Sequence, residues 1–219
     1  SQRFDVLQSG GAVFVRSDSD SSLTRIDTAL LELGDKTRIP AATRIALGAD
    51  TLASVDEEGA VRLASVDSPS GIAEGGEVLV EAGRDARLTV GVDGVAHVYS
   101  PTDGRVYSLA PDGGVSDFGA PAGLTADAVQ ITAVGPESVL FDAETGTVAG
   151  DGWSESVTGA TDTARVQLPG PDAVGVRVAT ETALVTVPMG GGGVEVTPLF
   201  DTIIRHVEEP KQLAKKDEP

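Results

Sequence analysis

Short stretches in which apolar and polar residues alternate recur along the whole chain, separated by glycine-rich turns. One clear copy reads Leu88–Gly91, Val95–Tyr99 and Val106–Leu109, with turns at Ser100–Gly104 and Pro111–Gly114. Alternation with a period of two predicts strands that turn one face toward a core. The Asp-Gly, Gly-Gly and Pro-Asp-Gly sequences supply the positive φ angles of tight hairpin turns. The pattern therefore predicts an antiparallel sheet of three or four strands.

This unit occurs five times. Each copy carries a marker glycine at the end of its first alternating stretch: Gly10, Gly48, Gly91, Gly135 and Gly170. Successive markers are 38, 43, 44 and 35 residues apart. A four-stranded antiparallel unit that repeats every ~40 residues is typical of the blades of a β-propeller. The alternative, a pair of β-sandwiches of about 100 residues each, explains the strands but not the repeat.

We therefore expect an all-β fold, a β-propeller of five degenerate four-stranded blades over residues 1–197. The expected blades are 1–40, 41–84, 85–125, 126–162 and 163–197. Propellers have about four to eight blades, so five can close into a ring. However, the chain starts directly on a strand at Phe4, and the fifth copy has no evident closing strand. Either the ring is incomplete or the first strand pairs with the last.

The composition changes at Thr197–Pro198. Residues 1–196 contain a single lysine, Lys36, whereas the last nine residues contain Lys211, Lys215 and Lys216. Apolar residues with helical spacing follow the change: Phe200, Ile203, Ile204 and Val207. This spacing predicts a short amphipathic helix over 198–210, opened by a proline. Residues 211–219 are polar enough to be disordered.

Composition and charge exclude several classes of function. The chain carries 34 acidic and 16 basic side chains, a net charge of −18, which repels nucleic-acid phosphates and anionic lipid surfaces. It has no cysteine, which excludes disulfides, Cys-ligated zinc and thiol nucleophiles. Two histidines and the lack of a nucleophile-elbow motif leave little material for a catalytic triad. No apolar run is long enough to span a bilayer, so we expect no membrane contact by this segment.

The stretches Phe4–Gly10, Val90–Gly94 and Ile131–Gly135 resemble the propeller-like extracellular region of large actinobacterial membrane-anchored proteins with fibronectin type III or Ig-like domains. The preference for Arg over Lys and the high Ala, Gly, Val and Asp content fit a high-GC organism of that kind. The resemblance covers about residues 4–198. It implies an extracellular, cell-surface location, with an N-terminal membrane anchor before this segment and further domains after it. That family has no established catalytic residues to carry over.

A second, shorter resemblance concerns the end of the chain. Residues Thr197–Val207 resemble a short helix near the end of the GTP-binding domain in BipA/TypA-type translational GTPases. The chain contains neither a Walker A sequence nor the guanine-reading Asn-Lys-x-Asp motif, so GTPase activity is not implied. The alternative is a helix that caps the last blade or belongs to a following domain.

Three residues are candidate ligand contacts. His97 and Tyr99 lie on the same face of one predicted strand, where they could line the axial channel of a propeller. The alternative for His97 is a half-buried structural histidine. Trp153, the sole tryptophan, could be an exposed ligand anchor, or it could pack between the fourth and fifth blades.

Asp18 and Asp20 are the candidate metal ligands. Their spacing in a turn is one that calcium loops use, but the glycine and the distal glutamate of an EF-hand are missing. A solvated hairpin tip is the alternative. Asp56–Gly59 and Asp142–Glu144 occupy the same place in their copies, which favours a role in turn formation over a metal site. Apart from this calcium hypothesis, the sequence predicts no cofactor.

Two functions remain open at this point. The first is a non-enzymatic extracellular scaffold or binding module that uses a propeller face for a protein or a cell-wall glycan. The second is a divalent-metal-dependent hydrolase or lactonase, with carboxylates around the axis holding one cation. We prefer the first, because the sequence contains the repeat and an acidic surface but no catalytic constellation.

Overall fold

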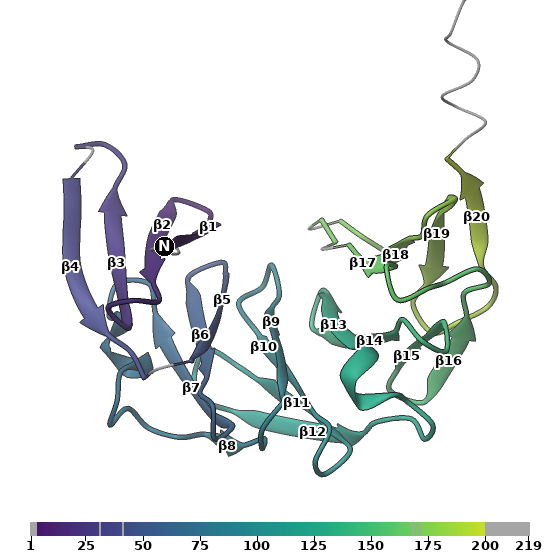
Figure 1. Cartoon of the computed structure of the whole chain (residues 1–219), viewed down its shortest axis with the longest axis horizontal. Helices are drawn as coiled ribbons and strands as arrows, with labels where there is room; N and C mark the ends of the chain where they lie inside the picture. The colour runs from purple at the N-terminus through teal and green to yellow at the C-terminus, as the bar shows by residue number, and fades with distance from the viewer. Residues whose placement is uncertain (1–3, 31, 41, 168, 171, 200–219) are drawn as a thin grey trace, which may run out of the picture.

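The computed structural model describes residues 4–30, 32–40, 42–167, 169–170 and 172–199. This part of the chain forms five four-stranded antiparallel sheets with almost no helix. In every sheet the strands are hydrogen-bonded in chain order, so each sheet is a simple meander. The sheets follow one another around an arc (Figure 1), as the blades of a β-propeller do. We number them blades 1 to 5 in chain order.

Each blade is built from strands of two to seven residues. Blades 1 and 2 contain β1 (Phe4–Ser9), β2 (Ala12–Ser17), β3 (Ser22–Asp27), β4 (Glu32–Arg38), β5 (Arg44–Gly48), β6 (Thr51–Val55), β7 (Ala60–Ser65) and β8 (Val80–Glu81). Blades 3 and 4 contain β9 (Arg87–Val90), β10 (Ala96–Ser100), β11 (Arg105–Leu109), β12 (Val115–Gly119), β13 (Val129–Val134), β14 (Glu137–Asp142), β15 (Thr147–Gly150) and β16 (Trp153–Ser156). Blade 5 contains β17 (Arg165–Val166), β18 (Gly175–Ala179), β19 (Ala183–Pro188) and β20 (Glu195–Pro198). Two short 3-10 helices, η1 (Pro69–Ile72) and η2 (Ala126–Ala128), lie in connections.

The propeller predicted from the repeat is confirmed, with one sheet for each copy. The last strand reaches one residue past the expected boundary. Pro198 pairs with Ala183 in β20 and does not start a helix at that point. The rest of the helix expected over 198–210, and the tail 211–219, lie outside the described residues. In the described ranges, no helix has the length and apolar character needed to cross a membrane.

The first strand of every blade lies on the inner side of the arc and the fourth on the outer side (Figure 1). The hydrophobic core lies between neighbouring blades rather than inside any one of them. Phe14 of blade 1, for example, packs in one cluster with Leu52 and Ile72 of blade 2. All five residues of β6 and all five of β10 are buried, because the middle strands are covered on both faces. Small side chains, mostly Ala and Val, fill these narrow interfaces.

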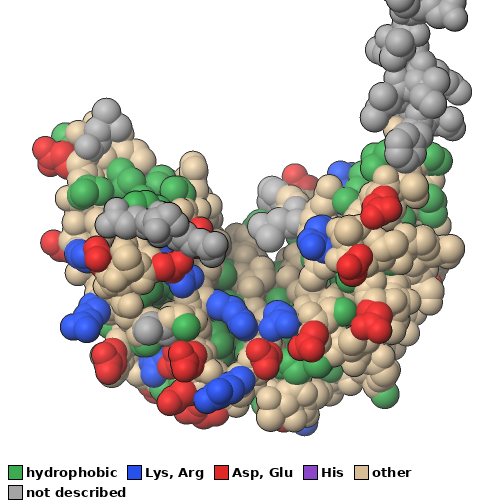
Figure 2. Space-filling model, viewed as in Figure 1, with side chains coloured by type: hydrophobic (Ala, Val, Ile, Leu, Met, Phe, Trp, Pro, Cys, Tyr) green, Lys and Arg blue, Asp and Glu red, His purple; other side chains and the backbone are tan. Residues whose placement is uncertain are grey.

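The arc is open: blades 1 and 5 stand at its opposite ends, and no described strand pairs one with the other (Figures 1 and 2). Phe14 points toward blade 2, so its neighbour Val15 points to the free face of blade 1. Val6, the cross-strand partner of Val15, is 65% exposed, and Leu33 is 75% exposed. This free face is therefore apolar.

The free face of blade 5 has a different character. Val176 and Val178 are buried against blade 4, so Arg177 between them points outward. Its cross-strand partner on that outward face is Thr186. The two ends of the arc thus present unlike surfaces, one apolar and one polar.

Candidate functional site

The inner strands converge at the end that carries the marker glycines. A Cβ atom added to Gly48 would lie 2.8 Å from the carbonyl oxygen of Val90 and closer still to that of Gly91. A Cβ atom added to Gly91 would lie 3.3 Å from the carbonyl oxygen of Gly135. Blades 2, 3 and 4 therefore meet backbone to backbone at this end. At Gly48 and Gly91 there is therefore little or no room for a side chain.

At the opposite end, where the inner strands begin, the structure contains a cavity of about 810 Å³. We call this cavity the axial mouth. Its lining comes from the starts of the inner strands of blades 2 to 5, from the loops before β13 and β17, and from the turn after β14: Arg44, Ile45, Arg87, Leu88, Asp127, Ala128, Val129, Gln130, Ile131, Ala143, Glu144, Thr161, Asp162 and Arg165. The inner strands thus form a funnel that is tight at the glycine end and open at the mouth.

The same residue types recur around the axial mouth. Arg44, Arg87 and Arg165 are the first residues of β5, β9 and β17, and we call these three the guanidinium rim. In blade 4 the equivalent position is taken by Gln130. The residue after each of these is aliphatic. Three of them line the cavity, and we call these the aliphatic layer: Ile45, Leu88 and Ile131.

Two of the rim positions connect neighbouring blades. Arg44 donates from Nη1 to the carbonyl oxygen of Ala86, the residue before the next inner strand. Gln130 donates from Nε2 to the carbonyl oxygen of Ala164 at 2.8 Å, and its Oε1 accepts from the backbone N–H of Val166 at 3.0 Å. In both cases a side chain at the start of one inner strand is hydrogen-bonded to the backbone at the start of the next inner strand. The rim is therefore part of the scaffold as well as part of the cavity wall.

The other two rim arginines bond to their own entry loops. Arg87 donates from Nη1 to the carbonyl oxygen of Asp85, and Arg165 donates from Nη1 to those of Asp162 and Ala164 at 2.7 and 2.8 Å. The ion pairs in the described part of the chain all involve other cations. A guanidinium has five N–H donors in a planar fork. Each rim arginine is thus fixed through one nitrogen and keeps donors for a further partner.

Acidic residues line the side of the axial mouth formed by blades 4 and 5. Asp127 lies in η2, Glu144 in the turn after β14, and Asp162 in the loop before β17. Figure 2 shows basic and acidic side chains beside one another along the hollow inner side of the arc. The mouth therefore offers both signs of charge, with aliphatic surface between them.

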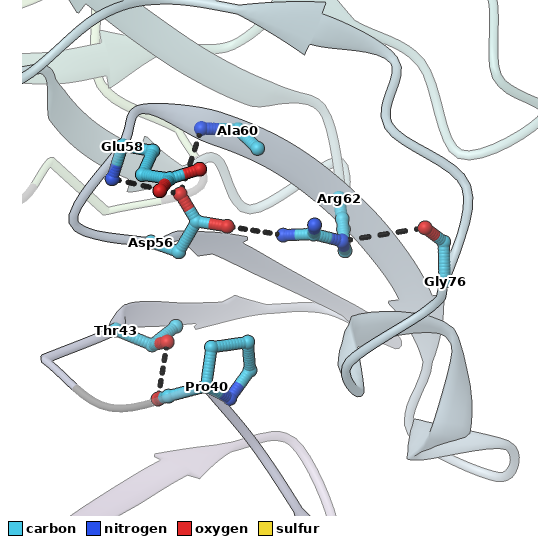
Figure 3. Close-up of polar contacts among 7 residues, drawn as sticks. All are labelled: Pro40, Thr43, Asp56, Glu58, Ala60, Arg62 and Gly76. Atoms are coloured by element: carbon cyan, nitrogen blue, oxygen red, sulfur yellow. Dashed lines mark hydrogen bonds and ion pairs between the residues drawn. The ribbon is translucent and has the colours of Figure 1, made fainter.

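The recurring turn aspartates serve their own turns. Asp56 accepts from the backbone N–H groups of Glu58 and Ala60 at 3.1 and 2.9 Å, and its other oxygen pairs with Arg62 at 2.7 Å (Figure 3). Arg62 also donates to the carbonyl oxygen of Gly76 at 3.3 Å. The ion pair of Asp56 and Arg62 therefore links the turn after β6 to the connection between β7 and β8. The role in turn formation expected for this carboxylate is what the structure shows.

Asp142 plays the same part in blade 4. Its side chain accepts from the backbone N–H groups of Glu144 and Thr145 at 2.9 and 3.2 Å, and from that of Thr125 at 2.7 Å. Burial by itself would raise the pKa of Asp142, but these three hydrogen bonds outweigh it and hold the pKa below its usual value. The carboxylate stays ionised, and its oxygens are occupied by backbone donors.

His97 and Tyr99 fill the interface between blades 3 and 4, and neither lines the axial mouth, contrary to the expectation that they face the channel. His97 is fully buried, with Nδ1 2.6 Å from the hydroxyl oxygen of Ser138 and 3.2 Å from that of Ser108. Burial lowers its pKa to about 4, so the ring is neutral at pH 7. Tyr99 packs with Val129 and other residues of blade 4. The structural alternative given for His97 applies, except that the ring is fully buried and not half-buried.

Trp153 packs against the core shared by blades 4 and 5. A Cβ atom on Gly150 would lie 2.7 Å from Cε2 of its indole ring, so the ring covers that glycine. The residue is half-buried and does not belong to the lining of the axial mouth. Its place matches the expected alternative of packing between blades.

Asp18 and Asp20 are not brought together around a shared position. Asp18 pairs with Arg16 at 2.7 Å and Asp20 pairs with Lys36 at 3.1 Å. Within the ranges that the structure describes, no group of three His, Asp or Glu side chains is placed to hold a metal ion. The calcium hypothesis therefore has no third carboxylate ligand among these residues.

The axial mouth was not predicted from the sequence, although the repeat contains a signal for it. Arg44 and Arg87 both stand four residues before a marker glycine, and Gln130 and Arg165 both stand five residues before one. A charged or amide residue followed by an aliphatic one thus opens all five copies, since Asp5 and Val6 stand in the same place before Gly10. The repeat itself could have identified the rim.

No protein-family model and no curated protein matches the chain. Solved structures of similar fold do match. Virginiamycin B lyase from Staphylococcus aureus with quinupristin has a TM-score of 0.53 at 9% identity, over 91% of this chain and 75% of that one. A functionally unknown protein from Desulfotomaculum acetoxidans has a TM-score of 0.57 at 13% identity, over 89% and 68%. YCF48 bound to D1 peptide has a TM-score of 0.54 at 14% identity, over 89% and 66%. At such low identity the likeness shows the propeller fold alone.

Proposed function

We propose that this chain is a non-catalytic binding module that holds a segment of a partner protein in its axial mouth. The observation that carries the proposal is the cavity itself, about 810 Å³ at the open end of the funnel and lined by four blades. Ligand pockets in proteins have about 300–1,000 Å³, with apolar walls and a few convergent polar groups. The mouth has this character, since its aliphatic layer lies beside charged groups of both signs.

A peptide segment suits this lining better than a glycan does. None of the described residues that line the cavity is aromatic, so they offer a sugar ring no flat face on which to stack. A peptide offers what the wall complements: aliphatic side chains, backbone N–H and C=O groups, and isolated charges. The peptide-bound state of YCF48, a propeller of similar fold, is in keeping with this choice.

The metal-dependent hydrolase has less support. Such an enzyme needs several carboxylates that converge on one cation. The turn carboxylates Asp56 and Asp142 bind their own backbone N–H groups, and the described part of the chain offers no three-ligand cluster. The proposed cell-surface location, as part of a membrane-anchored parent protein, rests on the resemblance to actinobacterial extracellular propellers.

A random peptide library tests the proposed function. Labelled protein is screened against bead-bound octapeptides with free and with amidated C-termini. The same screen is run with Ala128→Trp, which places an indole in the cavity wall, and with the control Ala110→Trp, an equally half-buried alanine outside the cavity. Circular dichroism checks that both variants fold.

We expect peptides that bind the wild type and Ala110→Trp to lose their binding to Ala128→Trp. Peptides that bind all three proteins equally would contradict a site in the axial mouth. A screen that enriches no peptide of either kind would contradict the function.

A further inference from the structure

The guanidinium rim and the aliphatic layer meet between neighbouring blades, and this placement suggests what the mouth recognises. Successive residues of a strand point to opposite faces of the sheet, so Arg87 and the next residue, Leu88, face different blades. Arg87 shares a face of blade 3 with its cross-strand partner Tyr99, and Tyr99 packs in one cluster with Ile131 of blade 4. A ligand that enters between Arg87 and Ile131 therefore needs an anionic group and an aliphatic group close together.

We propose that the axial mouth recognises the C-terminal residue of a peptide, through its free carboxylate and an aliphatic side chain. This inference rests on the proposed peptide-binding function and names the part of the peptide that is read. In a C-terminal residue the carboxylate and the side chain share one Cα atom. The carboxylate binds the guanidinium rim while the side chain packs on the aliphatic layer.

The rim is prepared for a carboxylate. Arg87 is half-buried, donates from one nitrogen to its own loop, and has no carboxylate partner in the described part of the chain. The planar fork of an arginine matches a carboxylate through two parallel hydrogen bonds. Because the loop already fixes the guanidinium, less conformational entropy is lost when the ligand binds.

The charge distribution argues for one carboxylate and against a polyanion. Asp127, Glu144 and Asp162 line the mouth on the side of blades 4 and 5. Arg44 and Arg87 line it on the side of blades 2 and 3. The whole chain carries a net charge of −18, which repels nucleic acids and polyphosphates. A peptide that ends in one carboxylate meets the rim without extending further negative charge along the acidic wall.

The test uses four probes of defined chemistry. The first is an acetylated hexapeptide, Gly-Ser-Gly-Ser-Val-Leu, with a free carboxylate, and the second is its C-terminal amide. The third is the free acid with serine in place of the last leucine. The fourth is octanoate, an aliphatic carboxylate without a peptide. Affinities are measured by calorimetry on the intact chain at low and at moderate salt.

We expect the free acid to bind at least ~10-fold more tightly than the amide, since hydrogen bonds to charged groups are the stronger ones. We also expect it to bind more tightly than the serine-ended peptide. In Arg87→Gln the difference between acid and amide should disappear. Arg177→Gln, an exposed arginine outside the cavity, serves as the control and should leave the difference unchanged.

Arg87 is chosen because, among the described residues, its side chain bonds within its own loop, so its loss does not disconnect two described blades. Thermal melting of each variant checks the fold, and Arg87→Lys, which keeps the charge but not the fork, should retain part of the preference.

Equal affinity of acid and amide for the wild type would overturn the inference, as would failure of the free acid to bind at millimolar concentration. The proposed function survives either result if other peptides bind in the mouth by the library screen. Octanoate that binds as tightly as the free acid, with the same dependence on Arg87, would also overturn the inference, because the ligand would then be a free aliphatic acid.

Discussion

Gly48 in blade 2 lies against the backbone of Gly91 in blade 3, so close that a methyl group on Gly48 would overlap with the carbonyl oxygen of Gly91. Gly48 ends β5, Gly91 directly follows β9, and both are markers of the repeat. The contact explains the glycine in these two copies, whereas the markers Gly10 and Gly135 have positive φ angles of 54° and 57° and open space around them. Blade-to-blade spacing around the axis is set by backbone contact at one end and by side-chain hydrogen bonds at the other.

Gly48→Ala is expected to lower the free energy of unfolding by about 1–3 kcal/mol, because the added methyl group overpacks a backbone contact. Gly119→Ala is the control, since a Cβ atom at Gly119 would meet nothing within 4 Å. Chemical denaturation measures both variants. An equal effect of the two substitutions would show that the blades do not meet at Gly48.

Gln130→Ala is expected to cost about 1–3 kcal/mol, because the carbonyl oxygen of Ala164 and the N–H of Val166 both lose their partner. Hydrogen exchange gives a local measurement: the amide of Val166 should exchange faster in the variant. Gln167→Ala, an exposed glutamine in the next blade, should change stability by less than about 0.5 kcal/mol. Unchanged protection of Val166 would contradict the link between blades 4 and 5.

The burial of His97 predicts a pH dependence. Its pKa is lowered from 6.5 to about 4 in the folded chain, so the unfolded chain binds the proton more tightly. The stability that neutral His97 contributes is complete above pH 6.5 and is lost as the pH falls toward 4. Urea denaturation between pH 7.5 and 4.5 should show a smaller loss for His97→Asn than for the wild type. Parallel curves for the two proteins would contradict this assignment.

Two ion pairs with different exposure should differ in strength. Asp56 and Arg62 have side chains that are each 11% exposed, whereas Arg25 and Asp67 are 42% and 80% exposed. Arg62→Met should cost about 1.5–3 kcal/mol, since a shielded carboxylate loses its charged partner. Arg25→Met should cost less than about 1 kcal/mol. Equal losses in thermal or chemical denaturation would show that burial does not strengthen the first pair.

The blades could be predicted from the sequence because each carries its own local signals. Alternation, turn dipeptides and a marker glycine recur in every copy, and each reflects a constraint that acts within about 40 residues. The same holds for Asp56, whose hydrogen-bond partners lie two to six residues away. The start of the predicted helix at Pro198 was wrong, because pairing with Ala183 extends the last strand.

Contacts between blades were harder to predict. His97 looks like a channel residue in its own strand, and only Ser138, 41 residues away, shows that the ring lies between two blades. The guanidinium rim could be predicted from the sequence only in part. Its residues recur at fixed distances before the marker glycines, so the repeat contained the pattern, but the cavity appears only when four blades stand around one axis.

The unlike end faces of the arc restrict how copies of this chain can assemble. Head-to-tail contacts, which propagate into rings or filaments, would place the apolar face with Val6 and Leu33 against the polar face with Arg177. Such a contact would cover apolar surface with groups that still need water. Only a two-fold, face-to-face pairing of two first blades matches apolar surface with apolar surface. Contact through these two faces would therefore favour a closed dimer over a growing polymer.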